Sequence, residues 1–334
     1  ETDEYDNSEL IMTRKWCRVH VGCLPLVGFA LLLAPSAVAG AGSAASQPVE
    51  TAPARVKLTG ADRAAALQQL RTLRAQLFTH TSGHGTAAQH GSAESAGPDG
   101  HAKTSSYMHI EFAFNDKATL SRFTNDDPHV GFMMGELWSS PVTIRLAKSF
   151  GGADPSGVRK PYWQLWRYSF ENPLSKGASP HSIGFASGDD WSYPAIVSVP
   201  EARSEKEFFE KYVREMLGVY REGNNIVLYR EDTTPQLGHS SDEYVFSLPL
   251  GGVLLSYADK YDPDSARTYT YEWRQTADGT VLPVKFTLNK TEVSQDRKNW
   301  HVIQRTVNFT KFELGPVPGK DLAVRALGPP GVGI

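Results

Sequence analysis

The stretch that most constrains the fold of this chain runs from residue 257 to 314, where apolar and polar side chains alternate. Aromatic side chains occupy every second position of residues 269–273. Residues 282–288 and, with an interruption at Arg305, residues 303–309 repeat this spacing. Because successive side chains of a strand point to opposite faces of a sheet, the alternation predicts strands with one buried face. The pair Asp278-Gly279 is a typical hairpin turn. We therefore expect an antiparallel meander whose apolar face covers a core or lines a cavity.

Composition and charge bound the class of protein. The chain has 334 residues, of which 40% are hydrophobic, and a formal net charge of -3. These values are typical of a globular protein with enough chain for one large domain or two small ones. Lys and Arg are scattered, without a dense basic block, so we expect no nucleic-acid partner.

The first 58 residues are interpreted as segments that precede the folded domain. Residues 1–11 are acidic and are expected to be an upstream extension of the chain. Residues 12–39 have the pattern of a secretory signal peptide: basic residues at 14–18, an apolar run at 24–33, and the small residues Ala37-Val38-Ala39. The apolar run is much shorter than the ~20 residues that span a bilayer. Residues 40–58 are expected to form a flexible tether. We therefore expect export, to the bacterial periplasm.

The two cysteines, Cys17 and Cys23, both lie within the predicted signal peptide. After cleavage the chain would hold no cysteine. The exported protein would then have no disulfide bond, no thiolate metal site and no cysteine nucleophile.

Residues 59–318 are predicted to form a single β-rich domain, followed by a C-terminal tail at 319–334. Two helices are expected, at 61–78 and 204–217, and Ser204 with Glu207 forms a capping box at the second. Residues 80–105 are rich in Gly, Ser and His, and we interpret them as a disordered loop. The alternative is a metal site on His80, His84, His90 and His101. No Cys or carboxylate is spaced to complete such a site, so we expect no bound metal.

The strand pattern predicts an α+β fold that is mainly antiparallel β. Residues 162–170 carry aromatic side chains on both faces, which indicates a central strand or one with a ligand-facing side. From residue 219 onward strands follow one another almost without a break, and so long a sheet must curl, split or be covered. We expect a strongly curved sheet or incomplete β-barrel with two helices packed on its concave side.

An enzymatic alternative rests on Asp189 and Asp190, which lie beside Trp191 and Tyr193. Paired carboxylates near aromatic residues occur in glycoside hydrolases. Adjacent residues on an extended chain point apart, however, and Asp in a Gly/Ser loop more often makes a turn. A hydrolase of envelope glycan or ester would combine either Asp with His181 or His239. The chain has no Gly-x-Ser-x-Gly or His-Glu-x-x-His motif, so we expect no enzyme and no cofactor.

Four segments carry a resemblance to a known family: Tyr-Asp-Pro-Asp at 261–264, Tyr-Glu-Trp-Arg at 271–274, Asp-Gly-Thr-Val-Leu-Pro at 278–283, and Val-Asn-Phe-Thr-Lys-Phe at 307–312. With the order of signal, helix, strands, helix and closing meander, they make the chain resemble the bacterial outer-membrane lipoprotein-sorting superfamily. That superfamily includes lipoprotein carriers and periplasmic sensors of envelope stress. The resemblance covers mainly residues 219–318, and it implies an incomplete β-barrel closed by helices around a cavity for acyl chains.

A curved sheet that fails to close leaves an apolar concave face, which side chains, helices or a ligand must fill. We therefore expect an exported, non-enzymatic protein that binds an acyl chain or lipoprotein in a half-barrel cavity. An envelope protein-binding or sensor module without a cavity stays open as an alternative. The candidate lining consists of Trp166, Tyr168, Phe170, Tyr269, Tyr271, Trp273, Leu282, Val284 and Phe286, and the candidate lid residues are Phe208, Phe209, Tyr212 and Met216. For each of these residues, ordinary packing in the core stays open as the alternative to ligand contact.

Overall fold

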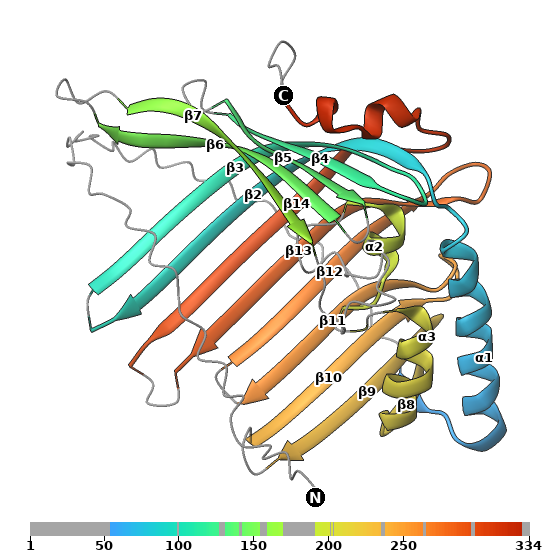
Figure 1. Cartoon of the computed structure of the whole chain (residues 1–334). Helices are drawn as coiled ribbons and strands as arrows, with labels where there is room; N and C mark the ends of the chain where they lie inside the picture. Colours follow the sequence, from blue (N-terminus) through green and yellow to red (C-terminus); the bar gives the residue numbers. More distant parts are fainter. Residues whose placement is uncertain are drawn as a thin grey trace, which may run out of the picture. The chain divides into compact units, whose positions relative to one another are not determined.

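Strands dominate the structure, a computed structural model that describes residues 54–98, 100–126, 131–139, 142–153, 159–169, 191–200, 202, 204–234, 238–262, 265–294 and 298–328 (Figure 1). All of these residues belong to one compact unit, Ala52–Ile334. The predicted upstream extension, signal peptide and first part of the tether lie outside the described residues.

The strands form one antiparallel sheet in the order β1-β8-β9-β10-β11-β12-β13-β14-β2-β3-β4-β5-β6-β7. The strands of the first half of the chain are β1 (Arg55–Lys57), β2 (Gly83–Gly97), β3 (Gly100–Phe114), β4 (Thr119–Asn125), β5 (Phe132–Ser139), β6 (Val142–Ala153) and β7 (Arg159–Ser169). Those of the second half are β8 (Gly218–Glu222), β9 (Asn225–Thr234), β10 (Gly238–Ser247), β11 (Val253–Asp262), β12 (Ser265–Gln275), β13 (Val281–Val293) and β14 (Trp300–Leu314).

Few helices accompany the sheet. They are α1 (Gly60–Leu77), the short α2 (Tyr193–Val197), and a continuous helical segment made of α3 (Glu205–Glu207), the π-helical turn η4 (Phe208–Tyr212) and α4 (Val213–Glu215). Two short 3-10 turns, η5 (Gly319–Leu322) and η6 (Val324–Ala326), follow the last strand. The Ser204 hydroxyl accepts a hydrogen bond from the Glu207 backbone N–H, as the predicted capping box requires. Within the described residues, no helix is both long and apolar enough to cross a bilayer.

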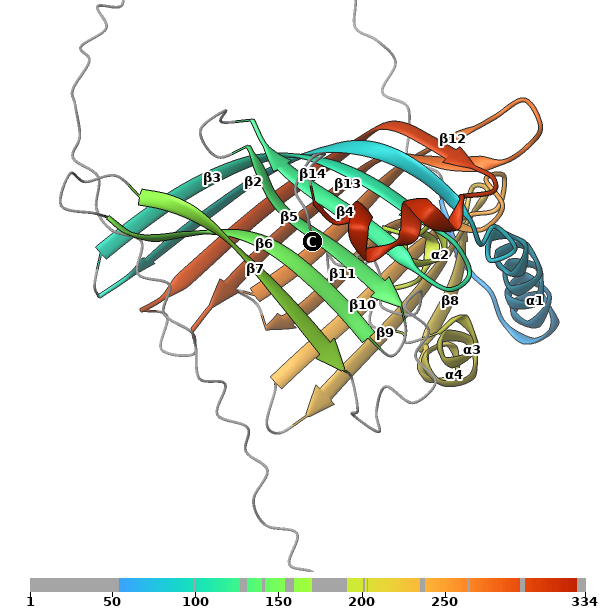
Figure 2. The ribbon, with the colours of Figure 1, turned by 45° about the horizontal axis from the view of Figure 1, so that its top comes forward.

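The sheet is curved, and within the described residues it is unclosed, because β1 and β7 end the strand order (Figure 2). The prediction of a curved, mainly antiparallel sheet is therefore confirmed, whereas two helices on its concave side stay a prediction. The prediction that residues 162–170 form a central strand is wrong. β7 is an edge strand, and Tyr162, Trp163 and Leu165 on it are 45%, 38% and 53% exposed.

The prediction of a disordered loop at 80–105 is also wrong. β2 and β3 form a long hairpin there, with Gly83 opposite Phe114 and Gly85 opposite Phe112. A side chain at either glycine would overlap the facing phenylalanine ring and a backbone carbonyl oxygen of β14. The glycines thus leave the space that the rings fill. The Gly, Ser and His content of the segment is typical of disordered loops, which is why composition suggested disorder. The alternate burial of these residues along β2 is not visible in composition.

The main core lies on one face of the sheet and joins strand residues to helix residues. Leu70 of α1, Ile196 of α2 and Phe208 of η4 are buried in the same cluster as Tyr244 of β10 and Tyr257 of β11. On α1 the buried residues Ala66, Leu70, Arg74 and Leu77 recur at helical spacing, so one side of that helix packs inward.

A second, smaller core includes Leu120 and Leu146 of the first-half strands and the buried Leu322 and Leu327 of the C-terminal segment. Ordered structure therefore continues past the predicted domain boundary at 318, because these leucines bury apolar surface. At the other end, β1 pairs with β8 inside the predicted tether, so the tether prediction is wrong for residues 55–57.

The β2 hairpin can be tested with Gly85→Ala. The added methyl group would meet the Phe112 ring and the Lys311 carbonyl oxygen, so we expect the free energy of unfolding to fall by about 1–3 kcal/mol. Gly319→Ala is the matched control, since nothing lies within 4 Å of its added carbon. Equal thermal unfolding midpoints for the two variants would contradict the close packing of β2 against Phe112 and β14.

Candidate functional site

A row of apolar side chains crosses the sheet from β9 to β13. The direct cross-strand partners are Leu228 and Tyr244, Tyr244 and Tyr257, Tyr257 and Tyr269, and Tyr269 and Leu288. The ring centroids of Tyr244 and Tyr257 are 4.6 Å apart, and those of Tyr257 and Tyr269 are 5.6 Å apart, both pairs stacked. We call these residues (228, 244, 257, 269 and 288) the aromatic row. They give the sheet a broad, rigid apolar surface.

Several predicted lining residues join this surface. Tyr269, Tyr271, Leu282 and Phe286 are buried in the main core, with Trp273 packed against it. Burial raises the pKa of the Tyr244 and Tyr271 hydroxyls, so both stay neutral at physiological pH.

Val284 departs from the predicted alternation. The register shifts between Glu272 and Trp273, whose partners are Lys285 and Pro283, so Val284 has no direct partner on β12. Its side chain is half-buried. The side chains of Trp166 and Tyr168, and the whole of Phe170, lie outside what the structure describes, so their lining role stays a prediction.

The helical segment 205–215, here called the cover helix, packs on the β9–β10 part of the aromatic row. The Phe208 ring lies 5.6 Å from the Tyr244 ring and 5.8 Å from the Phe246 ring. Phe209 and Met216 are also buried in the main core, and Tyr212 packs against it. The predicted lid residues thus come together on this surface. The π-helical turn at their centre is a feature often found at functional sites.

A buried arginine fixes the N-terminal end of the cover helix. Arg74 of α1 is 0% exposed, and its guanidinium donates to both carboxylate oxygens of Glu205. It also donates to the Val197 carbonyl oxygen at 2.9 Å and to the Gly252 carbonyl oxygen at 3.0 Å. One side chain therefore ties α1 to α2, to the cover helix and to the turn between β10 and β11.

The C-terminal end of the cover helix is held by more exposed groups. Arg230 of β9 donates to the Glu215 carboxylate at 3.2 Å, and these side chains are 28% and 49% exposed. Arg63 of α1 donates to the Met216 carbonyl oxygen at 3.2 Å. Because exposed ion pairs stabilise a structure little, this end is held less firmly than the Arg74 end.

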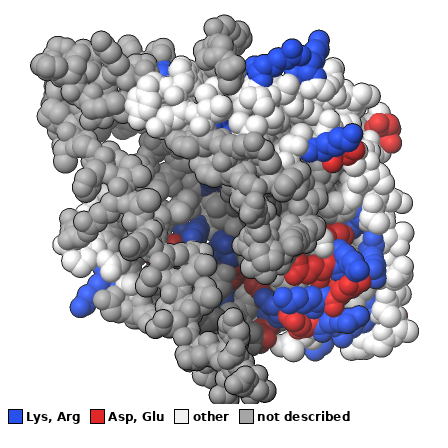
Figure 3. Space-filling model, viewed as in Figure 1, with Lys and Arg blue, Asp and Glu red and all other residues white. Residues whose placement is uncertain are grey.

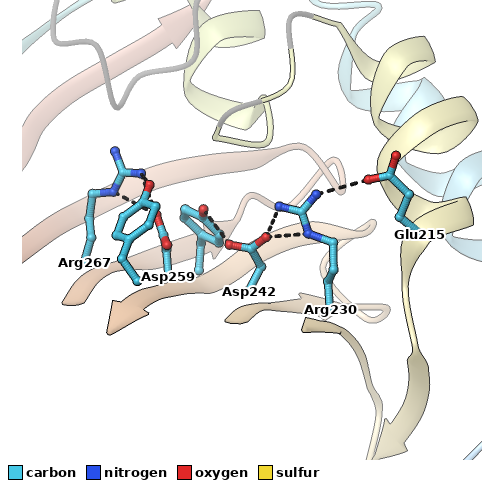
Figure 4. A network of polar contacts seen from close by, with 7 residues as sticks. Glu215, Arg230, Asp242, Asp259 and Arg267 are labelled. Carbon is cyan, nitrogen blue, oxygen red and sulfur yellow. Dashed lines mark hydrogen bonds and ion pairs between the residues drawn. The ribbon is translucent and has the colours of Figure 1, made fainter. Parts of the chain in front are cut away.

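A charged row follows the aromatic row along the same strands (Figure 4). Two residues on from the aromatic row, the cross-strand partners are Arg230 and Asp242, Asp242 and Asp259, and Asp259 and Arg267. Two residues along a strand return to the same face, so both rows share it. We call these four residues (230, 242, 259 and 267) the charged row.

The two carboxylates of the charged row are nearly buried, with Asp242 7% and Asp259 2% exposed. Arg230 binds Asp242 through Nε, at 2.7 Å, and through Nη2, and Arg267 binds Asp259 through Nε and Nη2 at 3.2 and 2.5 Å. Burial raises the pKa of Asp242 and the Arg230 charge opposes this rise. Each carboxylate therefore depends on its arginine, since like charges opposite each other repel.

Sequence reasoning missed the charged row, Arg74 and Tyr244. A signal for the row was nevertheless present, because a charged residue stands two positions from a tyrosine in Asp242-x-Tyr244, Tyr257-x-Asp259 and Arg267-x-Tyr269. Arg74 gave no such signal, because a lone arginine on an amphipathic helix reads as a solvated side chain.

Most residues of the hydrolase alternative lie outside the described structure, which therefore does not test it. Asp189, Asp190 and His181 lie outside the described residues. His239 is 55% exposed and pairs with Glu231 at 3.0 Å. No group of three or more His, Cys, Asp and Glu suited to a metal ion occurs among the residues that the structure describes.

Two hollows occur elsewhere on the described surface. One, of about 410 Å³, lies between the end of α1 and the β12–β13 turn, and the other, of about 390 Å³, lies between β2–β4 and the C-terminal segment. Neither is lined by Tyr244, Tyr257 or Tyr269. On the face shown in Figure 3, acidic and basic side chains are mixed where Figure 1 places α1 and α3. Mixed charge of this kind is typical of a solvated helix surface.

Comparison with known proteins gave structural similarities alone. No model of a known protein family matches the chain, and no curated protein matches it. Among solved structures, the chain is similar to the LolA superfamily protein NE2245 from Nitrosomonas europaea, with 12% identity, 79% of this chain and 99% of that chain covered, and a TM-score of 0.35.

Two further similarities are weaker in identity. A putative outer membrane lipoprotein-sorting protein domain from Vibrio parahaemolyticus is 8% identical, with 78% and 98% of the two chains covered and a TM-score of 0.33. A DUF1329 family protein from Desulfovibrio piger is 10% identical, with 79% and 98% covered and a TM-score of 0.33.

The Arg74 anchor can be tested with Glu205→Ala. Removing the carboxylate leaves the fully buried Arg74 charge uncompensated, and we expect a loss of about 3 kcal/mol in the free energy of unfolding. Glu210→Ala, at an exposed position of the same helix, should change it by less than about 0.5 kcal/mol. Urea unfolding of both variants measures the difference, and similar losses would show that Glu205 does not compensate Arg74.

Proposed function

We propose that this protein is an exported, non-enzymatic binder of an acyl chain, carried by a lipid or by a lipoprotein, and that the chain binds between the aromatic row and the cover helix. In this proposal α1 and the cover helix lie on the concave side of the sheet. Displacement of the cover helix exposes the aromatic row, and the acyl chain takes the place of the helix side chains.

The observation that carries the proposal is the way the aromatic row is covered. Phe208 packs on Tyr244 and Phe246 through apolar contacts that an acyl chain can replace in kind. Burying a methylene group is favourable by about 0.8 kcal/mol, so a chain of ordinary length offsets the contacts of one phenylalanine several times over. An apolar surface of this kind needs no specific polar partner to hold an acyl chain.

The attachment of the cover helix supports its movement. Its firm anchor, Arg74 with Glu205, lies at the N-terminal end, whereas Arg230 with Glu215 is exposed to solvent. The helix can therefore turn about its N-terminal end while the buried ion pair stays formed. The cost of releasing the exposed pair is about 0–1 kcal/mol.

The envelope location rests on the sequence features of residues 12–39 and on the resemblance to the lipoprotein-sorting superfamily. The expected partners are an acyl-chain ligand or lipoprotein and, for delivery or sensing, a protein of the envelope. The absence of a recognisable catalytic motif agrees with a binding role.

A second candidate function is the docking of an envelope protein at the sheet edge. The observation that favours it is the exposure of Tyr162, Trp163 and Leu165 on the edge strand β7. An edge strand with exposed apolar side chains is suited to the addition of a strand from a partner.

The first experiment is native mass spectrometry and lipid extraction of the full chain expressed in a bacterial host with an envelope. We expect a co-purifying acyl lipid that is displaced by a fatty acid carrying a solvent-sensitive fluorophore. A protein that carries no lipid and does not change the fluorescence would contradict the proposal, and edge docking would then lead.

The proposed binding surface is tested with Phe208→Ala. Removing the ring should lower the free energy of unfolding by about 3–5 kcal/mol and, because ring and ligand compete for the row, tighten binding of the fluorescent fatty acid severalfold. Leu120→Ala truncates a buried side chain of the second core and serves as control. It should lower stability without changing affinity, and an equal affinity change in both variants would sink the assignment of the site.

A further inference from the structure

Arg230 lies where the apolar and charged parts of the candidate site meet. Its neighbour on the same strand face is Leu228 of the aromatic row, and its cross-strand partner is Asp242 of the charged row. An acyl ligand that lies over the aromatic row with its headgroup toward the charged row would bring that headgroup to Arg230. The other cation of the charged row, Arg267, is bound to Asp259 and to the Tyr261 hydroxyl.

Two kinds of contact hold the Arg230 guanidinium. On one side, Nε and Nη2 donate to a single oxygen of the nearly buried Asp242, which fixes the plane of the guanidinium. The Tyr212 ring lies 5.4 Å from the guanidinium carbon and adds a cation–π contact. On the other side, Nη1 donates to Glu215, whose carboxylate is half exposed. Loss of Glu215 would therefore leave Nη1 in place and open to another acceptor.

We propose that Arg230 is the headgroup subsite for an acyl ligand with an anionic end, a carboxylate or a phosphate. The ligand anion takes the position of the Glu215 carboxylate on Nη1 and thereby releases the C-terminal end of the cover helix. Binding of the headgroup and opening of the cover helix are the same exchange. This inference rests on the proposed acyl-chain function and adds the chemical class of the ligand.

The charges of the site favour an anion as the exchanging group. In the closed form two arginines of the charged row face Asp242, Asp259 and, from the cover helix, Glu215. A ligand carboxylate in place of Glu215 leaves this balance unchanged, whereas a cation would have to displace an arginine from a nearly buried carboxylate. That displacement is costly, because it leaves a buried charge without its partner. A neutral headgroup would displace the Glu215 carboxylate from Arg230 without supplying an anionic acceptor in its place.

Three probes with the same alkyl chain separate the headgroup from the chain: laurate, dodecyl phosphate and dodecanol. At about pH 8 the two acids are ionised and the alcohol is neutral. For the wild-type full chain we expect all three probes to bind. The two anions should bind about tenfold tighter than dodecanol, which is the contribution expected from one charge-assisted hydrogen bond. Displacement of the fluorescent fatty acid measures each affinity.

Two variants shift the anion preference in opposite directions. Glu215→Gln removes the competing carboxylate from an exposed position, so it should tighten laurate and dodecyl phosphate severalfold and leave dodecanol unchanged. The double variant Arg230→Gln with Asp242→Asn removes both charges together, so that no buried carboxylate is left unpaired, and should abolish the preference for anions. Glu210→Gln, an equal change of charge at an exposed position of the same helix, should change none of the affinities.

The outcomes separate this inference from the proposed function. If dodecanol and both acids all fail to bind, the acyl-chain function itself is wrong. If dodecanol binds and the acids bind no tighter, or if Glu215→Gln and the double variant leave the anion preference unchanged, the headgroup subsite at Arg230 is wrong and the acyl-chain function survives. A preference for dodecyl phosphate over laurate, lost in the double variant, would identify a phosphorylated lipid as the source of the anion. Thermal unfolding of each variant confirms that the comparison is made on folded protein.

Discussion

The register between neighbouring strands is the constraint on which the candidate site depends. It sets Tyr244, Tyr257 and Tyr269 directly opposite one another on β10, β11 and β12. Because side chains return to the same face every second residue, the same register also aligns Asp242, Asp259 and Arg267 beside them. A slip of one residue on any of these strands would move its tyrosine and its charged side chain to the opposite face of the sheet, away from the two rows.

The two rows differ in how they tolerate change. An apolar contact on the aromatic row can be exchanged for another apolar contact at little cost, because the hydrophobic effect is not directional. The charges cannot be separated as easily, since Asp242 and Asp259 are nearly buried and each needs its arginine. The site therefore combines a replaceable apolar cover with a fixed polar border, and Arg230 is the residue at which both meet the cover helix.

The two ends of the cover helix are held by a buried ion pair and by a surface ion pair, respectively. Arg74 is fully buried and binds Glu205 together with two backbone carbonyl oxygens, so it fixes the N-terminal end in one geometry. Arg230 and Glu215 pair directly at the surface, with their side chains 28% and 49% exposed, so water competes for both charges. The π-helical turn between these ends places Phe208 and Tyr212 on the sheet side, next to Tyr244 and Arg230.

The sequence by itself determined the strands of the second half, the helix that begins after Ser204, and the burial of Tyr269, Tyr271 and Phe286, because alternation and capping are local signals. It did not predict the β2–β3 hairpin, in which Phe112 and Phe114 fill the space above Gly83 and Gly85 and so stabilise the paired strands. Likewise, only the tertiary structure decided that Arg74 is buried and that Arg230 joins Asp242 to Glu215. These contacts join residues far apart in the chain, and their energy exists only once the strands and helices have come together.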